Sequence, residues 1–155
     1  MGLWSGEYNK SLTYWGNKFH KIATEFIAQA GDIVYEDGTG SVCVYDGDVF
    51  DTETNNLTFW EPYLLAAAKR SDGKIGSQFF ITFEDLPQLN GEYCIFGRIY
   101  KGKEIFDTMN LFGSMEGKPQ GNVIIKRCGF YQPKEAKKYD LRDFNPEMEK
   151  RRQDF

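Results

Sequence analysis

The chain has 155 residues, of which 16% are aromatic, and 19 Lys and Arg stand against 23 Asp and Glu, giving a net charge of −4. A chain of this length buries enough surface for one hydrophobic core, so we expect a single domain. The acidic balance argues against binding to nucleic acid, which requires a concentrated basic face.

The N-terminus carries no charged-then-apolar signal, and no apolar run approaches the length of a membrane span. We therefore expect an intracellular protein, cytoplasmic by default, with an organelle such as a mitochondrion or cilium left open. The three cysteines, Cys43, Cys94 and Cys128, are odd in number and far apart, which predicts buried thiols rather than disulfides or a zinc site. The acidic stretch 46–53 lacks the spacing of an EF-hand, so we expect no metal and no cofactor.

Taken in chain order, residues 19–22 (FHKI) and the stretch ending at Gln29 predict two strands separated by a turn. His20 is the only histidine, and it has no serine or cysteine partner in a motif. A lone histidine of this kind is more often a structural residue than a general base, so we assign it a structural role.

Residues 76–83 (GSQFFITF) predict the central strand. Their side chains form two alternating sets, Phe79, Ile81 and Phe83 in one and Gln78, Phe80 and Thr82 in the other. This is the period of a strand with one face in a core and the other free to line a groove.

A helix is expected over residues 103–110, with Ile105 and Met109 on one face, and residues 133–155 are highly charged. Within this extension Asn145 and Pro146 resemble a helix start. Because so charged a segment cannot bury itself, it is either disordered or bound along a partner, and we favour the second.

Segments spread along the chain, in order, resemble those of the cyclophilins, the barrel-shaped peptidyl-prolyl cis-trans isomerases. They are residues 19–22 (FHKI), 26–32 (FIAQAGD), 38–40 (GTG), 76–82 (GSQFFIT), 89–91 (LNG), 96–98 (FGR), 101–109 (KGKEIFDTM), 112–114 (FGS) and 124–129 (IIKRCG). The resemblance implies a mainly β fold, a cyclophilin-like antiparallel β-barrel over residues 1–132 with a capping helix, followed by the 133–155 extension. The last of these segments would be the closing strand.

The same resemblance implies that the barrel is incomplete. Members of this family begin with two long strands and a helix, whereas here only 18 residues precede Phe19. A barrel closes only if every strand has two neighbours, so we expect an open sheet edge and an exposed core face. A separate polypeptide, a large assembly or a mis-assigned start methionine would account for this, and we favour the first two. The expected partners are thus other protein subunits of a larger assembly, together with a proline-containing peptide segment.

Lys21 stands where the family has its catalytic arginine. Rotation about an X-Pro bond is slow because amide resonance must be broken, and the family's guanidinium accelerates it by donating to the prolyl nitrogen. Lysine keeps the charge but lacks the planar fork of donors. Two interpretations stay open, a solvated surface lysine and a weakened catalytic residue.

The resemblance also assigns the substrate-binding positions: Phe26, Ile27, Gln29, Ala68, Lys69, Gln78, Phe80, Leu89 and Tyr93. Tyr93 replaces the usual histidine and Gln88 a frequent tryptophan, so the resemblance does not extend to cyclosporin affinity. Lys69, followed by Arg70 and Lys74, would either make the groove basic and favour an acidic ligand or form an ordinary solvated charge run.

These observations lead to one main hypothesis for the function and two alternatives. The leading hypothesis is a structural or proline-binding subunit of a larger complex, with weak or lost peptidyl-prolyl cis-trans isomerase activity. The runner-up is an active isomerase completed by strands from another chain, and the third is a fragment without a stable fold.

Overall fold

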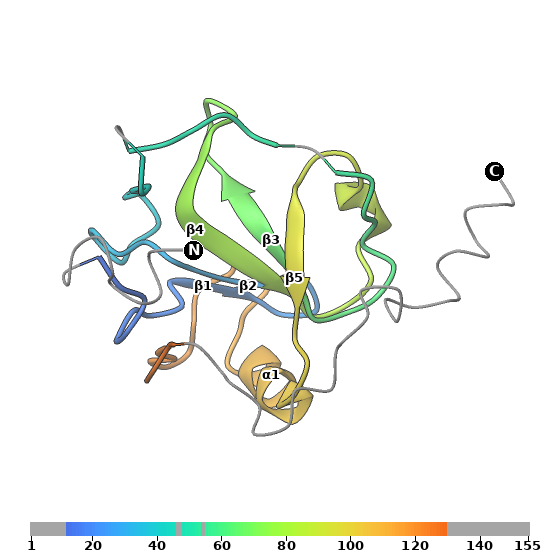
Figure 1. Cartoon of the computed structure of the whole chain (residues 1–155). Coiled ribbons are helices and arrows are strands. Elements are labelled where there is room, and N and C mark those ends of the chain that lie inside the picture. The colour runs from blue at the N-terminus through green and yellow to red at the C-terminus, as the bar shows by residue number, and fades with distance from the viewer. Residues whose placement is uncertain (1–11, 46–47, 54, 130–155) are drawn as a thin grey trace, which may run out of the picture.

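A computed structural model of the chain describes residues 12–45, 48–53 and 55–129 (Figure 1). Its described residues contain one antiparallel sheet with the strand order β1-β2-β4-β3-β5. The strands are β1 (Lys21–Ala23), β2 (Ile27–Ala30), β3 (Leu64–Lys69), β4 (Ile75–Thr82) and β5 (Ile95–Arg98). A 3-10 helix, Pro87–Leu89, precedes β5, and the helix α1 (Lys103–Leu111) follows it. The described fold is therefore mainly β, as the sequence predicted.

In β3 buried and less buried side chains alternate strictly from Leu64 to Lys69. The central strand β4 does not alternate in this way, because Phe80, Ile81 and Thr82 are all buried. The sequence predicted one face of this strand in a core and the other free to line a groove, whereas both faces are largely covered. Residues paired directly across neighbouring strands share one face of the sheet. We call the face that carries Ile27, Leu64 and Phe80 the first face, and the opposite one the second face.

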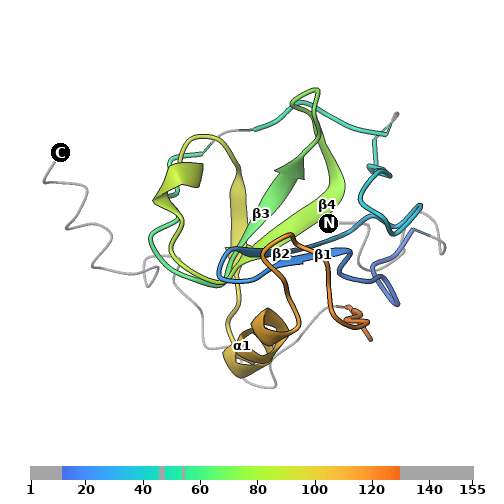
Figure 2. The same cartoon turned by 180° about the vertical axis from the view of Figure 1, so that it is seen from behind.

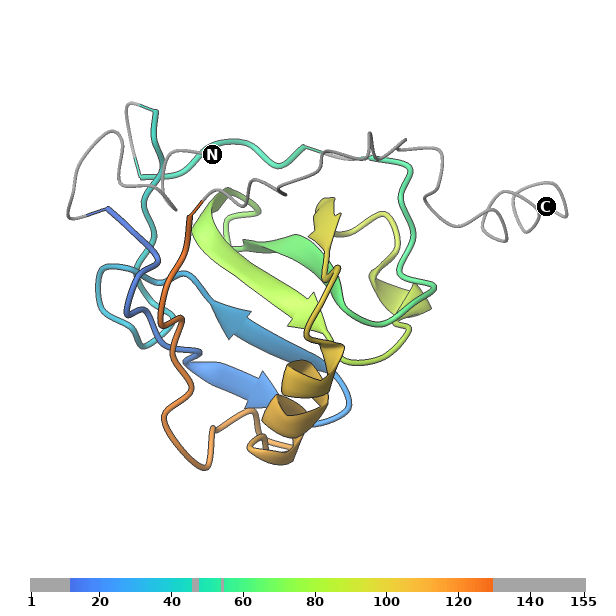
Figure 3. The ribbon, with the colours of Figure 1, turned by 60° about the horizontal axis from the view of Figure 1, so that its bottom comes forward.

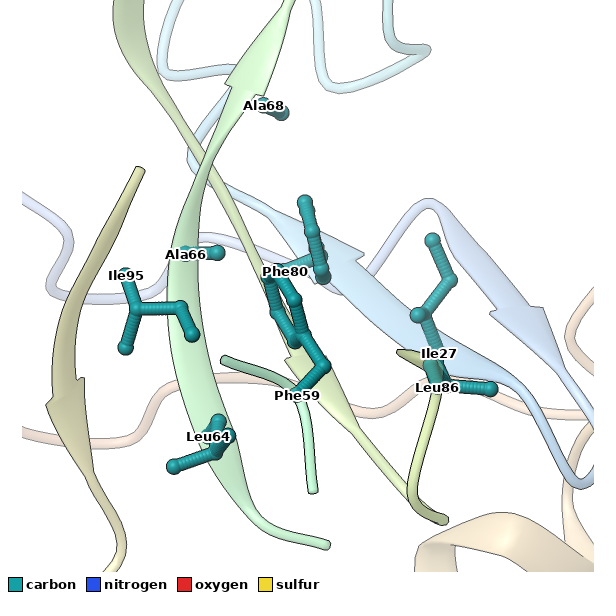
Figure 4. Packing of buried hydrophobic residues seen from close by; sticks show 8 residues of the cluster. All are labelled: Ile27, Phe59, Leu64, Ala66, Ala68, Phe80, Leu86 and Ile95. Carbon is teal, nitrogen blue, oxygen red and sulfur yellow. The ribbon is translucent and has the colours of Figure 1, made fainter. Parts of the chain in front are cut away.

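The first face carries one of two hydrophobic clusters, shown in Figure 4. Phe59 and Leu86, from segments that cross this face, pack on the strand residues, and the Phe59 ring stacks on Phe80 with centroids 6.1 Å apart. Phe59 is fully buried and Phe80 is 2% exposed. The chain thus covers its own first face.

The second cluster lies on the second face, around Ile22, Ala28 and Ile81, where Met109 of α1 packs against it. Figure 3 shows α1 beside the end of β1. Ile105 and Met109 line the same recess, as predicted for residues on one face of the helix. Only Met109 is buried on that face, because Ile105 is 64% exposed.

The predicted closing strand at 124–129 forms only in part. Its start bonds to residues 16–19 through an antiparallel bridge between Lys18 and Ile124, and Phe19 N donates to Val123 O at 2.9 Å. The preceding loop bonds to β1, because Ile22 N donates to Gly117 O at 2.9 Å. Figure 2 shows this orange segment running beside β1.

At the other side of the sheet, no described strand pairs with the outer edge of β5. The described sheet is therefore open at β5. The predicted 133–155 extension, with its proposed helix, lies outside the described residues. None of the helices in the described ranges is long and apolar enough to cross a membrane.

Candidate functional site

Strand register brings the predicted site residues together on the first face. Lys21 pairs with Gln29, Gln29 with Phe80, and Phe80 with Ala66. Since neighbouring strands lie about 4.8 Å apart, the backbone of Lys21 is about 10 Å from that of Phe80. A cation, an amide and an aromatic ring thus follow one another across three strands.

The apolar part of the site has a buried base and a more exposed border. Phe80, Ile27 and Ala68 are at most 7% exposed and form the base, within the hydrophobic cluster of the first face. The partly buried side chains of Phe26, Leu89 and Tyr93 pack against that cluster from outside. Tyr93 stands edge-on to Phe80 at a centroid distance of 5.2 Å. A ligand on this face would therefore meet the border side chains before the Phe80 ring.

The two predicted glutamines are joined in one network. Gln29 Nε2 donates to Gln78 Oε1 at 2.8 Å, and Gln78 Nε2 donates to the carbonyl oxygens of Gly38 (2.9 Å) and Gly40 (2.6 Å). Gln78 is buried, whereas Gln29 is partly exposed. Gln78 therefore holds the 38–40 turn, and the Gln29 amide is the member of this network that can meet a ligand.

Asp32 fixes the same turn from its other side. Its buried carboxylate accepts backbone N–H bonds, two of them from Gly38 and Gly40 at 2.9 Å each. Burial alone would raise the pKa of the Asp32 carboxyl, but bonds from the N–H groups of Tyr35, Gly40, Val34 and Gly38 together hold it well below its usual range. Asp32 is therefore ionised at neutral pH and acts as a structural anion.

Gly31, just before Asp32, is required by close packing. Its φ is +92°, and a Cβ atom built there would lie 2.3 Å from Ser77 O on β4. Any larger residue would push the start of the 32–40 loop away from β4. The glycine therefore lets this loop reach the site.

Lys21 is exposed, and its stem lies over the 114–117 turn. A Cβ atom built on Gly117 would come within 3.0 Å of Lys21 Cγ, so glycine leaves the space that the lysine stem occupies. The neighbouring His20 packs against Gly38, and burial lowers the pKa of its imidazole although Asp32 and Asp37 oppose the shift. An imidazole that is neutral at pH 7 and packed against a turn fits the structural role predicted for it.

Lys69 lies at the border of the apolar patch, on the side opposite Lys21. Its Nζ atom is 5.1 Å from the centroid of the Tyr93 ring and 3.5 Å from Glu92 Oε2. Gln88, by contrast, is exposed on the 3-10 helix. The two cations thus flank an apolar centre from different strands.

Two residues of the site were missed by the sequence reasoning. Phe59 lies in a stretch without regular periodicity, so no pattern indicated that its ring stacks on Phe80. Asp32 stood inside the 26–32 segment, and the glycines that follow it were the only signal of a turn built around a carboxylate.

The Gln29 amide, the exposed Lys21 ammonium and the apolar patch can together hold an uncharged, compact side chain and donate to its backbone. This combination suits recognition of a peptide more than covalent chemistry. Within the described ranges, no group of three or more His, Cys, Asp or Glu is placed to hold a metal ion.

Comparison with known proteins gives a consistent result. Residues 6–130 match the family model described as cyclophilin type peptidyl-prolyl cis-trans isomerase/CLD. Peptidyl-prolyl cis-trans isomerase 9 of Caenorhabditis elegans is 40% identical over 119 residues, which are 76% of this chain and 38% of that protein. The Caenorhabditis briggsae protein of the same name is 39% identical over the same shares. The chain thus spans less than half the length of these curated relatives.

A solved structure agrees with the sequence matches. The cyclophilin type peptidyl-prolyl cis-trans isomerase of Cryptosporidium parvum, crystallised in the presence of the dipeptide Ala-Pro, superposes with a TM-score of 0.72 at 35% identity. The match covers 85% of this chain and 81% of that one. Because the family model and the solved relative both cover most of the sequence, the chain belongs to the cyclophilin-type peptidyl-prolyl cis-trans isomerase family.

Proposed function

We propose that the chain binds proline-containing peptides on its first face as a subunit of a larger protein complex, with weak isomerase activity. The partly buried border of Phe26, Leu89 and Tyr93 offers an apolar surface that suits a proline ring, and Gln29 pairs with Phe80 at the base of the same face. The crystallisation of the Cryptosporidium parvum relative in the presence of Ala-Pro supports a proline peptide as the ligand.

The observation that carries this proposal is Lys21. Catalysis requires a contact that is stronger with the twisted amide than with the planar one. The exposed ammonium on a flexible stem replaces a rigid guanidinium fork, so less of its bonding is preorganised. The loss of one preorganised donor costs roughly 3 kcal/mol, or about a hundredfold in rate.

The test is a comparison of isomerisation rates. The full chain, Lys21→Arg and Lys21→Ala are assayed on one proline tetrapeptide by NMR exchange, and peptide binding is followed separately by chemical-shift titration. We expect binding in all three proteins, a slow wild-type rate and a rise of ten- to a hundredfold in Lys21→Arg. A fast wild type that gains nothing from arginine would contradict weak activity, and absence of binding would contradict the proposal itself.

A second candidate is an active isomerase completed by strands from another chain. It is favoured by the outer edge of β5, with which no described strand pairs, and by the partly exposed second face, both of which suit strand addition. Its test is the isomerase rate of the assembly purified from its source. A rate far above that of the isolated chain, and abolished by Lys21→Ala within the assembly, would favour this second candidate.

A further inference from the structure

Lys69 is a cation fixed at the edge of the apolar patch. Its side chain is only 23% exposed, and its Nζ atom lies 5.1 Å from the centre of the Tyr93 ring. Tyr93 in turn stands against Phe80, with ring centres 5.2 Å apart. The Tyr93 ring therefore lies between the ammonium and Phe80 at the base of the apolar patch. A peptide bound on that patch would lie close to the ammonium.

The anion that Lys69 meets within the chain is loosely held. Glu92 Oε2 is 3.5 Å from Lys69 Nζ, and the Glu92 side chain is 69% exposed. Water screens an ion pair whose carboxylate is this exposed, so the pair contributes little to stability. The ring thus positions the ammonium, whereas a ligand anion can displace Glu92 at little cost.

The neighbouring cations differ from Lys69 in this respect. Arg70 Nε pairs with Asp72 at 3.7 Å, and both side chains are about half exposed. Lys21, on the other flank of the patch, is exposed on β1. Among these three groups, Lys69 combines a fixed ammonium with direct contact to a side chain of the apolar border.

We propose that Lys69 determines specificity, selecting peptides that carry an anionic side chain beside the proline. This inference rests on the proposed binding of proline peptides to the first face. The shared chemistry is an anionic oxygen, supplied either by the carboxylate of Asp or Glu or by a phosphate group on serine. Lysine accepts both, because its compact ammonium donates from three N–H groups without a fixed plane.

The experiment measures dissociation constants of the full chain for three series of proline hexapeptides. Each series varies one position, either two residues before the proline, directly before it or directly after it, as Glu, Gln, Lys or phosphoserine. In at least one series we expect the Glu peptide to bind about three- to tenfold more tightly than its Gln isostere, and the Lys peptide to bind most weakly. A further gain for phosphoserine identifies phosphate as the source of the anion, and its absence identifies carboxylate.

Four variants assign the preference to Lys69. Lys69→Gln should abolish it, Lys69→Arg should keep it, and Glu92→Gln should strengthen it by removing the competing anion. The matched control is Lys103→Gln, at the first residue of α1. Lys103 Nζ also lies 5.1 Å from the centroid of a tyrosine ring, that of Tyr63. This variant removes the same charge and the same kind of ring contact, and it should leave the preference unchanged.

The outcomes separate the two proposals. Equal binding of Glu and Gln peptides in every series, with chemical-shift changes still at Phe26 and Leu89, overturns the role of Lys69 and leaves proline binding intact. A preference that survives in Lys69→Gln but is lost in Lys103→Gln overturns it as well. Absence of binding by every peptide overturns the proposed function and this inference together.

Discussion

The two faces of the sheet differ in how far the chain covers them. On the first face, Phe59 and Phe80 are 0% and 2% exposed beneath segments of the same chain. On the second face, six apolar side chains of the cluster remain only partly buried, and a recess of about 370 Å³ opens between α1 and Val123. The first face leaves four apolar side chains partly buried around the candidate site, while the second face leaves six and the recess for another element to cover.

This difference between the two faces bears on two proposed roles, peptide recognition on the first face and association with a partner on the second. The residues proposed to contact a peptide are positioned by Gln78, Asp32 and the stacked rings, all on or above the first face. Lys21 is the exception, since β1 is held at its outer edge by the 114–117 loop that continues to the second face. An element that covered the second face would therefore affect the position of Lys21 more than that of the apolar patch.

The largest expected effect tests how far the chain covers the first face. Phe59→Ala removes a fully buried ring and should lower the free energy of unfolding by about 3–5 kcal/mol. Phe106→Ala, the matched change at a partly buried phenylalanine of the second face, should cost less than half as much. Urea unfolding of both variants measures the difference, and equal costs would remove the contrast between the faces.

Asp32 gives the next largest effect, through pH. Because the pKa of Asp32 is lower in the folded chain than the value of about 3.9 usual for the unfolded state, ionised Asp32 stabilises the fold above that pH. This contribution is lost as the pH falls through the unfolded and then the folded pKa. Asp32→Asn should cost about 2–3 kcal/mol at pH 7 and flatten the loss of stability below pH 4.

Urea midpoints between pH 3 and 7 measure this effect. The control is Asp85→Asn, because Asp85 is exposed. An Asp32→Asn profile parallel to the wild-type profile would show that the buried carboxylate does not account for the acid sensitivity of the fold.

Both large effects concern residues that sequence patterns did not single out, which shows where prediction from sequence ends. Strands β1, β2 and β4 and the family followed from sequence patterns and from ordered segment matches, whereas β3 (Leu64–Lys69) was not predicted. The bonds of Asp32 depend on loop geometry rather than periodicity, and Phe59 reaches Phe80 across 20 residues of chain. Helical spacing placed Ile105 and Met109 on one face of α1, but it does not show how far neighbouring elements extend over that face, and Ile105 is 64% exposed.

A smaller effect is expected within the amide network of the first face. Gln29→Leu removes the bond to Gln78, at a cost of about 1 kcal/mol in unfolding free energy, and it should weaken proline-peptide binding severalfold. Urea unfolding and a peptide titration measure the two losses. Gln88→Leu, at an exposed glutamine, should change unfolding by no more than about 0.5 kcal/mol. If Gln29→Leu bound peptide normally, Gln29 would be only a support for the 38–40 turn.

The smallest effect tests the open second face directly. Ile105 lines the recess beside α1 but is 64% exposed, so Ile105→Gln should change the unfolding free energy of the isolated chain by less than about 0.5 kcal/mol. Met109→Gln, at the buried position of the same helix face, should cost several times more, because it places an amide among apolar groups. A cost above about 2 kcal/mol for Ile105→Gln would mean that some part of this chain already covers the recess. The alternative outcome is that Ile105→Gln leaves the unfolding free energy of the isolated chain unchanged but weakens association in an assembly purified from the source. That outcome would mean that a partner covers the recess, and that the apolar surface left on the second face is what the partner binds.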